Sequence, residues 1–295
     1  MKPFSGASAH RAGLVLEGGA MRGLFTAGVL DYLMEKELRF DGAVGVSAGA
    51  VFGCNFKSRQ RGRVLRYNLR FCRDPRYCSW RSLILTGCLF GTDFCYRELP
   101  ETLDPFDGAV YEADPLKFFL VCTDVATGEA FYRECPVADR ECFEWMRASA
   151  SMPLVSQIVA VGGRGYLDGA LADSIPLEFM ERTGYGRNLV VLTQPEGFIK
   201  QPNRMLPLLK LRYRRYPKLL QAIAARHELY NRQLVYVKER EDAGAALVLR
   251  PAAPLPIERI THSPEAIRQT WQAGYDMAAA HFDDIRRFLM PGEIA

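Results

Sequence analysis

Histidine is scarce in this chain, and its scarcity limits the choice of general bases. Four histidines occur in 295 residues, and none lies in a recognisable catalytic motif: His10, His227, His262 and His281. Histidine is the side chain that most often serves as a general base near neutral pH. The sequence therefore favours a carboxylate as the base of any nucleophilic chemistry, unless the fold brings a distant histidine to the nucleophile.

Paired cysteine motifs are also missing. None of the eight cysteines is spaced as C-x-x-C, the spacing typical of zinc and redox sites. A chain of this size without a recognisable export signal does not need a disulfide framework. We therefore expect reduced and mostly buried thiols at Cys54, Cys72, Cys78, Cys88, Cys95, Cys122, Cys135 and Cys142.

The chain has neither a strong charge nor a long apolar run. Its net charge is +4 and its pI is about 8.6, which is too mild to indicate nucleic-acid binding without an RNA-binding or zinc-finger motif. No run approaches the roughly 18 apolar residues of a membrane-spanning helix. Residues 1–12 form a polar leader without the apolar core of a secretory signal. The sequence thus predicts a cytoplasmic protein with no nucleic-acid partner and a faint preference for anionic surfaces.

Two strand-and-helix units stand near the start of the chain. Residues 13–16 and 42–46 are short apolar runs bounded by glycine, and helix-period apolar residues follow them at 22–35 and 48–56. Consecutive units of this kind imply a right-handed crossover and parallel strands. The predicted fold class is α/β, with a largely parallel central sheet and with sites outside the carboxyl ends of its strands.

The rest of the chain changes pattern twice. Residues 60–115 contain many glycine and proline breakers and predict an irregular, cap-like insertion in a core at 13–200. Residues 201–295 predict a basic helical extension whose C-terminal helix packs on that core. Further expected strands lie at 116–123, 130–132, 158–161, 166–167, 188–193 and 246–250, and further helices at 139–149 and 264–289.

The first chemical motif is Gly45-Val46-Ser47-Ala48-Gly49, at the turn from the second strand into its helix. A serine hydroxyl attacks a carbonyl only when it is exposed on a tight turn and has a base beside it. Small residues on either side, as here, let strand and helix approach closely in a nucleophile elbow. The alternative is a serine that caps an ordinary helix.

The second motif is the glycine-rich turn between the first strand and its helix. Backbone N–H groups at such a turn are suited to hold an oxyanion, and the candidates are Gly18, Gly19, Ala20, Met21, Arg22 and Gly23. A dinucleotide fingerprint is the rival interpretation, but the spacing G-G-A-x-R-G lacks its glycine pattern. The turn therefore favours oxyanion binding over nucleotide binding.

The third motif is Asp168-Gly169-Ala170, at the exit of a hairpin that turns at residues 162–165. The Asp168 carboxylate there is free to act as the base. The alternative is that Asp168 caps the helix expected near Asp173, although Asp173 is itself the better placed cap.

In this order, the three motifs resemble those of the patatin-like phospholipase family, and the stretch Arg147-Ala148-Ser149-Ala150-Ser151-Met152-Pro153 is similar to another of its signatures. The resemblance runs from about residue 13 to 192. It implies a three-layer patatin-like fold and a Ser47–Asp168 dyad with Ser47 as nucleophile and Asp168 as base. It also implies that neither a metal nor a cofactor takes part, and that the substrate is a phospholipid or another acyl ester. The supporting motif residues are Gly45, Gly49, Gly169 and Ala170.

One residue departs from the family pattern. Ala20 stands where the family's loop has its third glycine, and its methyl group is tolerable there if φ at Ala20 is negative. This departure motivates a second hypothesis, a catalytically weak protein that binds lipid or a partner. A third hypothesis is a Ser-His-Asp hydrolase completed by His262 or His281.

Two further questions stay open at this stage. Glu17 is either an ion-pair partner of Arg22 or a solvated carboxylate. Residues 204–226 interleave basic side chains with leucines, and Pro207 and Pro217 are expected to break or kink this stretch. The stretch is either an ordinary packed helix or a surface that touches an anionic membrane.

Overall fold

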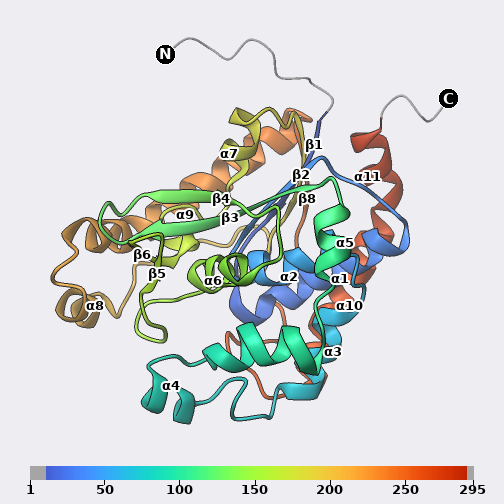
Figure 1. The fold of residues 1–295 in the computed structure, drawn as a ribbon. Coiled ribbons are helices and arrows are strands. Elements are labelled where there is room, and N and C mark those ends of the chain that lie inside the picture. The colour runs from blue at the N-terminus through green and yellow to red at the C-terminus, as the bar shows by residue number, and fades with distance from the viewer. Residues whose placement is uncertain (1–10, 291–295) are drawn as a thin grey trace.

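A computed structural model describes residues 11–290, which fold into a mixed eight-stranded sheet between two layers of helices (Figure 1). The strands follow the order β5-β6-β3-β2-β1-β7-β8, and β4 pairs with the free edge of β3. Strands β3, β2, β1, β7 and β8 are parallel. The predicted α/β class is therefore confirmed. The bounds are β1 Ala12–Leu16, β2 Gly42–Val46, β3 Lys117–Asp124, β4 Ala130–Glu134, β5 Val159–Val161, β6 Arg164–Asp168, β7 Arg187–Val191 and β8 Ala246–Leu249.

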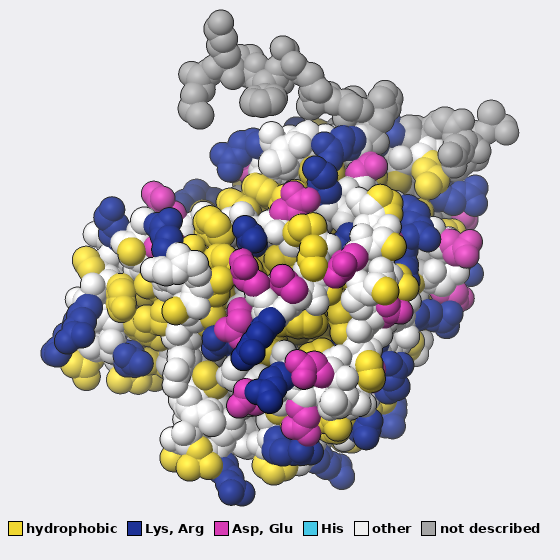
Figure 2. Space-filling view, viewed as in Figure 1, with side chains coloured by type: hydrophobic (Ala, Val, Ile, Leu, Met, Phe, Trp, Pro, Cys, Tyr) yellow, Lys and Arg dark blue, Asp and Glu magenta, His cyan; other side chains and the backbone are white. Residues whose placement is uncertain are grey.

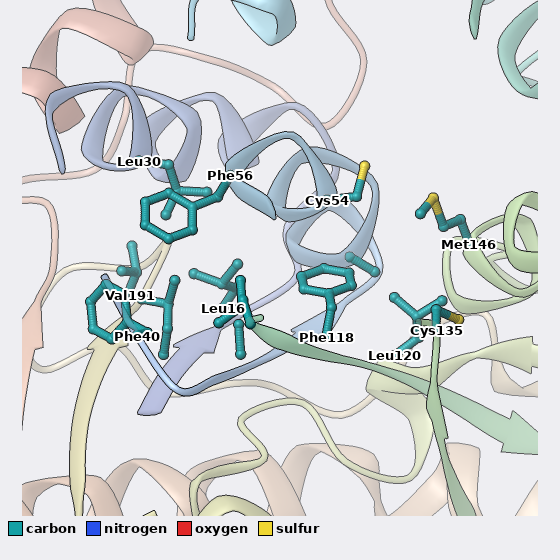
Figure 3. Packing of buried hydrophobic residues seen from close by; sticks show 14 of the residues in the cluster. Leu16, Leu30, Phe40, Cys54, Phe56, Phe118, Leu120, Cys135, Met146 and Val191 are labelled. Carbon is teal, nitrogen blue, oxygen red and sulfur yellow. The ribbon is translucent and has the colours of Figure 1, made fainter. Parts of the chain in front are cut away.

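Alternate side chains of the central strands pack on opposite helix layers. Leu14 and Leu16 of β1 belong to a core shared with α1 (Gly23–Glu35), α2 (Ala48–Lys57), α6 (Arg140–Ser149) and α11 (Phe282–Leu289). Figure 3 shows Leu16 between Leu30 and Phe118 in this core. Val15 faces the other way, toward α7 (Leu177–Arg182) and α9 (Pro217–Asp242). The period of two that a buried strand requires thus places helices on both faces of the sheet.

The segment 60–115 is helical, and its description as irregular was wrong. It forms α3 Arg63–Phe71, α4 Trp80–Thr86, the π-helix η2 Phe94–Leu103 and α5 Gly108–Ala113. Its glycines and prolines bound short helices instead of preventing them. Gly62 precedes α3 and Gly87 follows α4, and both have positive φ. The helices are too short for their apolar period to stand out from the sequence.

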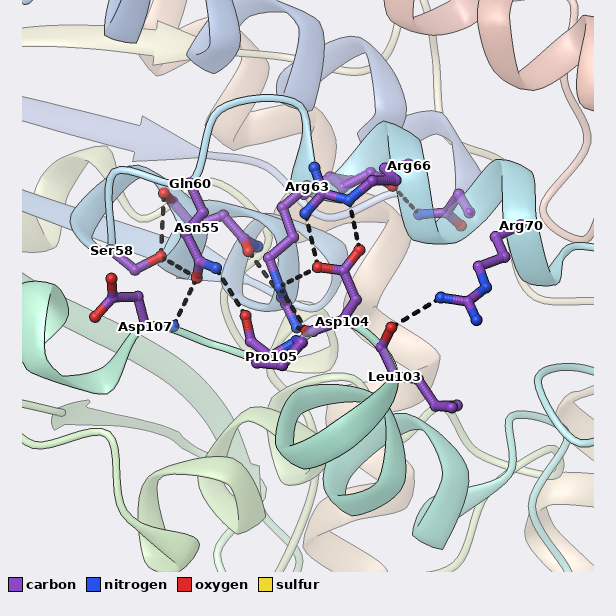
Figure 4. A network of polar contacts seen from close by, with 12 residues as sticks. Asn55, Ser58, Gln60, Arg63, Arg66, Arg70, Leu103, Asp104, Pro105 and Asp107 are labelled. Carbon is purple, nitrogen blue, oxygen red and sulfur yellow. Dashed lines mark hydrogen bonds and ion pairs between the residues drawn. The ribbon is translucent and has the colours of Figure 1, made fainter.

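A polar network fastens α3 to the end of η2 (Figure 4). Arg66 donates two hydrogen bonds to the Asp104 carboxylate, at 2.7 and 2.8 Å, and Arg63 donates to the Asp104 carbonyl oxygen. Arg70 donates to the carbonyl oxygen of Leu103. Bidentate pairing of this kind fixes direction as well as distance, so α3 and the end of η2 are held in a fixed relation within the insertion.

Each of the two helical stretches predicted in the C-terminal third is divided into two helices. The basic stretch forms α8 (Leu206–Arg212) and the start of α9, and the expected final helix forms α10 (Pro264–Ala280) and α11, divided at His281. Pro207 and Pro217 lie in the first turns of α8 and α9. A proline there lacks an N–H that the helix does not need, so the two prolines begin helices and do not kink one.

Helices α1 and α10 cross at a pair of glycines. A Cβ atom added at Gly28 would lie 1.9 Å from the Trp271 carbonyl oxygen, and one added at Gly274 would lie 1.9 Å from the Phe25 carbonyl oxygen. The Trp271 indole N–H donates to Asp31 at 2.7 Å beside this crossing. The crossing thus attaches the C-terminal helices to the helix that follows the glycine-rich turn.

The substitution Gly28→Ala is expected to lower the free energy of unfolding by about 1–3 kcal/mol, because a methyl group there meets backbone that cannot yield. Gly108→Ala is the matched control, since its added Cβ would lie 3.6 Å from Ala138, an ordinary contact. Chemical denaturation followed by circular dichroism measures both variants. Equal stability of the two would contradict the close packing of α1 and α10.

Candidate active site

Strand β3 brings the predicted serine and aspartate together. Strand β2 pairs with β3 up to Val46, which lies opposite Val121. Strand β6 pairs antiparallel with the same strand from Cys122 onward, and its last residue, Asp168, lies opposite Cys122. Val121 and Cys122 are consecutive, so β2 and β6 run toward each other along β3. The residues at their meeting ends, Ser47 and Asp168, are therefore adjacent although 121 positions separate them.

The Ser47 hydroxyl donates a hydrogen bond to Oδ2 of Asp168 at 2.7 Å. The two residues are 6% and 3% exposed. The other carboxylate oxygen of Asp168 accepts the Ala170 amide at 2.9 Å and so caps the short 3₁₀ helix η3 (Gly169–Leu171). Asp168 is thus a partner for serine and also a helix cap, with one oxygen for each, but the helix that it caps is η3 and not the one expected near Asp173.

The assignment of Asp173 as a helix cap was wrong. Helix α7 begins four residues later, at Leu177, with Pro176 at its cap position. The Asp173 carboxylate instead accepts hydrogen bonds from the hydroxyl of Tyr132 and the amide of Gln233, each at 2.5 Å. It joins β4 to α9 and takes no part in the site.

Ser47 has the strained backbone of a nucleophile elbow. Its φ is 54° and its ψ is −120°, and its side chain does not cap α2. The Ser47 amide donates to the Ser149 hydroxyl at 3.0 Å, which donates in turn to the Val121 carbonyl oxygen at 2.7 Å. A Cβ atom added at Gly49 would lie 2.3 Å from the Leu16 carbonyl oxygen. Close packing and the Ser149 bridge therefore hold a conformation that costs roughly 1–3 kcal/mol.

The glycine-rich turn presents its amides beside Ser47. Within residues 11–290, the N–H groups of Gly18 and Gly19 have no hydrogen-bond acceptor, and a Cβ atom added at Gly18 would lie 2.9 Å from the Ser47 Cβ. The turn continues into the 3₁₀ helix η1 (Ala20–Arg22). Free donors this close to the hydroxyl suit a site that stabilises negative charge.

Ala20 does not meet the condition set for it from the sequence. Its φ is +50°, in the region that favours glycine, and this conformation costs a residue with a Cβ roughly 1–2 kcal/mol. The backbone of the turn is therefore strained at Ala20, the position where the family pattern has glycine.

Glu17 supports the turn and does not pair with Arg22. One Glu17 carboxylate oxygen accepts the Tyr230 hydroxyl at 2.6 Å, and the other accepts the Thr193 amide at 2.6 Å. The Thr193 hydroxyl also donates to the Gly18 carbonyl oxygen at 3.0 Å. Both earlier interpretations of Glu17 were wrong, because the carboxylate is buried and joins the ends of β1 and β7 to α9.

Burial raises the pKa of the Asp168 carboxyl above its ordinary value. The nearby cation Arg226, the Ser47 hydroxyl, the Ala170 amide and Lys200 oppose this rise. A carboxylate made more basic by burial, and still favoured as an anion by these partners, suits a general base.

Two cavities meet at Ser47. A narrow one of about 100 Å³ is lined mostly by apolar side chains of α2 and the insertion, among them Phe52, Tyr67, Tyr77 and Phe90. A wider one of about 510 Å³ holds Ser47, Asp168 and the glycine-rich turn, together with four cationic side chains. These are Arg22, Lys200, Arg226 and Arg259.

The histidines of the described residues lie away from the dyad. His262 Nδ1 is 2.5 Å from the Cys72 carbonyl oxygen, His281 Nδ1 is 3.6 Å from the Asp284 carboxylate, and His227 lies near the Ala224 carbonyl oxygen. His10 is outside the described residues. The carboxylate is thus the base that the geometry offers to Ser47.

The sequence did not identify several residues of the site. The motif resemblance covered Ser149 without a role for it, and a single serine in a helix carries no signal of the amide that it will hold. Lys200 and Arg259 lie in loops, and Arg226 lies in a helix rich in basic residues. Only the fold brings these cations to one cavity.

Residues 11–290 contain no cluster of three metal-ligating side chains. None of their helices combines the length and the apolar character that crossing a bilayer requires. All eight cysteines are unpaired, and seven are buried, with Cys95 partly exposed.

Comparisons with known proteins agree with the motifs. A family model described as patatin-like phospholipase matches residues 14–180, and one described as a domain of unknown function, DUF6363, matches residues 216–290. The uncharacterized protein YjjU of Escherichia coli K12 is 29% identical over 205 residues, which are 68% of this chain and 56% of that protein.

Two more distant similarities were found. The putative patatin-like phospholipase domain-containing protein M110.7 of Caenorhabditis elegans is 28% identical over 197 residues, which cover 61% of this chain and 16% of that protein. The crystal structure of VipD from Legionella pneumophila aligns with a TM-score of 0.45 and 12% identity, over 93% of this chain and 67% of VipD. The chain thus spans about half of the first relative and less than a fifth of the second. Because the first family model matches more than half of its residues, this protein belongs to the patatin-like phospholipase family.

Proposed function

We propose that this protein is a serine lipid acyl hydrolase in which Ser47 is the nucleophile and Asp168 the general base. The observation that carries the proposal is the 2.7 Å hydrogen bond between the Ser47 hydroxyl and a buried Asp168 carboxylate, at the meeting point of two cavities. Family membership supports the reaction class, since lipid acyl esters are its general substrates.

The geometry suits a two-step acyl transfer. Asp168 accepts the hydroxyl proton as Ser47 Oγ bonds to the ester carbonyl carbon, and amides of the segment 18–23 stabilise the oxyanion. The tetrahedral intermediate then expels the alcohol, which takes the proton from Asp168 and leaves an acyl group on Ser47. Water, deprotonated by Asp168, attacks this ester and releases the fatty acid and the free Ser47 hydroxyl.

The narrow cavity is the proposed acyl site. Its lining is predominantly apolar and aromatic, and Ser47 is one of the lining residues. Burying methylene groups in such a cavity contributes about 0.8 kcal/mol for each of them. The helical insertion supplies eight of the nineteen lining residues, so differences in this segment would affect the preferred chain length.

A surface around the mouth of the wide cavity is the proposed contact with membranes. Exposed apolar side chains lie there on two short helices, Trp80, Ile84 and Leu85 on α4, and Leu208 and Leu211 on α8. Trp80 and Leu208 also line the cavity.

The charge of this surface favours an anionic lipid interface. Basic side chains accompany the apolar ones on both helices, and residues 204–218 contain no acidic side chain. Figure 2 shows apolar and basic side chains gathered at the left and lower left, where α8 and α4 lie in Figure 1. Such a surface binds membranes by apolar insertion together with attraction to anionic head groups.

The two other hypotheses make different predictions. A Ser-His-Asp mechanism requires His262 or His281 near Ser47, whereas each has a partner elsewhere. The other hypothesis is a protein that binds lipid or a partner without useful turnover. The positive φ of Ala20 is the observation that favours it. Labelling of Ser47 by a fluorophosphonate would contradict the binding hypothesis.

Ser47→Ala and Asp168→Asn are each expected to reduce ester hydrolysis by about 10⁴-fold or more, because one removes the nucleophile and the other its base. Hydrolysis of p-nitrophenyl esters of increasing chain length measures the effect, with circular dichroism as the check of folding. His262→Ala and His281→Ala are the controls and should retain activity. Loss of activity in a folded histidine variant would contradict the dyad.

The value of kcat/KM should fall on the acid side with an apparent pKa above the ordinary aspartate value of about 3.9, because Asp168 acts as an anion and burial raises its pKa. The raised pKa means that the folded chain binds this proton more tightly than the unfolded chain does. The contribution of Asp168 to stability therefore declines as pH rises through this interval and not as pH falls. Acid inactivation without a change in circular dichroism would agree with this assignment.

Ile84→Asp and Leu211→Asp are expected to weaken binding to phosphatidylglycerol vesicles by roughly tenfold each, because each removes apolar insertion and adds a repelled charge. Val235→Asp is the matched control, an apolar side chain that is 59% exposed on α9 and lies outside the wide cavity. Vesicle sedimentation measures the binding. Equal losses in all three variants would argue against a membrane surface formed by α4 and α8.

A further inference from the structure

Two tyrosines bring hydroxyl groups into the narrow cavity, although most of its lining is apolar. Tyr67 of α3 and Tyr96 of η2 line this cavity together with Ser47. Within residues 11–290, neither hydroxyl has a hydrogen-bond partner, whereas a third lining tyrosine, Tyr77, donates to Asn68 Oδ1 at 2.8 Å. The cavity therefore contains two hydrogen-bond donors that the described protein does not itself use.

The Tyr67 hydroxyl faces the open volume of the cavity. The residue is only 3% exposed. In the described part of the chain, the enclosed side-chain polar atoms without a partner belong to Arg22, Thr26, Tyr185, Asn188 and Thr270. The Tyr67 oxygen is not among them, so it keeps accessible surface although the side chain is buried. Because Tyr67 lines the narrow cavity, a molecule in that cavity can reach this oxygen.

Leaving these hydroxyls without partners is unfavourable. A hydroxyl that is taken out of water and finds no partner loses its hydrogen bonds with solvent. Phenylalanine at either position would keep the aromatic ring and avoid that cost, so ring packing does not account for the hydroxyls. Burial raises the pKa of both Tyr67 and Tyr96, which keeps them protonated at neutral pH. Both are thus ready to donate to an acceptor on a ligand.

The insertion also holds the two tyrosines in position. The Arg63 guanidinium lies 5.5 Å from the centre of the Tyr67 ring. The paired hydrogen bonds from Arg66 to the Asp104 carboxylate join α3, which carries Tyr67, to the end of η2, which carries Tyr96 (Figure 4). Donors that are fixed before binding lose little freedom when an acceptor arrives.

The volume of the cavity limits where such an acceptor can lie. A dry cavity of about 150 Å³ holds one benzene molecule. The narrow cavity, at about 100 Å³, is smaller, and it has room for roughly four chain atoms on the same scale. An acyl chain that is bound to Ser47 would therefore place its first few atoms beside the two tyrosines. The acceptor must lie on this part of the chain, close to the ester carbonyl.

We propose that the acyl group transferred by Ser47 carries an ether, hydroxyl or keto oxygen near its carbonyl end, and that the Tyr67 and Tyr96 hydroxyls bind this oxygen. The inference rests on the proposed hydrolase function and names its acyl substrate as an oxygenated chain instead of a plain alkyl chain. A site built to bind such an oxygen disfavours an analogue without it, because the donors then remain unpaired. The apolar side chains of the lining accept the carbon atoms on either side of the oxygen.

The kinetic test compares p-nitrophenyl esters of hexanoic, 3-ethoxypropanoic and 4-methoxybutanoic acid, whose acyl chains have equal length. Each ether replaces one methylene group by oxygen and so reduces the apolar surface that the chain can bury. A cavity that binds by apolar contact alone would prefer the hexanoyl ester. The proposal predicts the opposite order, with kcat/KM roughly fivefold higher for the better ether ester, the ratio that about one neutral hydrogen bond provides.

Tyr67→Phe and Tyr96→Phe each remove one hydroxyl and keep the ring. Each is expected to lower the ratio of kcat/KM between the better ether ester and the hexanoyl ester by roughly fivefold. Using the ratio cancels any effect of the variant on the dyad, which acts on both esters. If only one variant lowers the ratio, the oxygen is bound by that tyrosine alone.

Tyr185→Phe is the matched control. The Tyr185 hydroxyl also lacks a partner among the described residues, but Tyr185 does not line the narrow cavity, so its loss should leave the ratio unchanged. A wild type that prefers the hexanoyl ester would overturn the proposal and leave ordered water as the partner of the two hydroxyls. A ratio that neither cavity variant lowers would overturn it as well.

A binding test separates this proposal from the proposed function. Titration calorimetry with the folded Ser47→Ala variant measures affinity for the p-nitroanilides of the same three acids without turnover. The better ether anilide is expected to bind roughly fivefold more tightly than the hexanoyl anilide, and adding Tyr67→Phe should remove that difference. Equal or weaker binding of both ether anilides would overturn the proposal, whether or not the wild type hydrolyses esters. Failure of the hydrolase function alone would appear as the same binding preference without hydrolysis in the wild type.

Discussion

Strand β3 offers one edge to two partners, and the site depends on how that edge is divided. Strand β2 occupies it as far as Val121, and β6 occupies it from Cys122 onward in the opposite direction. Because hydrogen-bond registers are discrete, a slip of one residue in either strand would turn every side chain to the other face. The short distance between Ser47 and Asp168 is thus a consequence of sheet pairing, and no flexible loop has to bring them together. The same strand anchors Ser149, whose hydroxyl holds the Ser47 amide.

A second set of contacts links the edge that carries Ser47 and Asp168 to the C-terminal part of the chain. The buried Glu17 carboxylate joins the glycine-rich turn to Tyr230 of α9, and Arg226 of the same helix reaches the Ala170 carbonyl oxygen behind the dyad. On the other face, Gly28 and Gly274 allow α1 and α10 to touch backbone to backbone. The segment matched by DUF6363 therefore contacts the helix after the glycine-rich turn, Glu17 before that turn, and Ala170, the second residue after Asp168. Changes in how the DUF6363 segment packs would alter the positions of residues at the site, although Ser47 and Asp168 themselves lie within residues 14–180.

The sequence predicted the central sheet, and singled out Ser47 and Asp168, because these signals are local. Glycine and valine runs, a serine between small residues and an aspartate before glycine each occupy a few consecutive positions. It failed where distant parts of the chain decide the outcome. The α3 and α4 helices are too short for periodicity, the partners of Glu17 lie 176 and 213 residues away, and the φ of Ala20 follows from the packing of the whole turn. The cations of the wide cavity were invisible for the same reason, since their separate positions carry no shared motif.

Backbone strain and unpaired charge occur together in and around the cavity that contains Ser47. Ser47 and Ala20 both have positive φ, the Gly18 and Gly19 amides lack acceptors within the described residues, and four cations form no direct ion pair there, although Glu17 and Asp168 partly neutralise them. Each of these features lowers the stability of the empty chain, and negative charge near Ser47 would offset the last two. A fold selected for stability alone would remove such costs by substituting glycine at position 20 or a carboxylate near Lys200. Their common location, in the cavity where an oxyanion would form beside Ser47, is the strongest physical argument that the arrangement serves binding and catalysis.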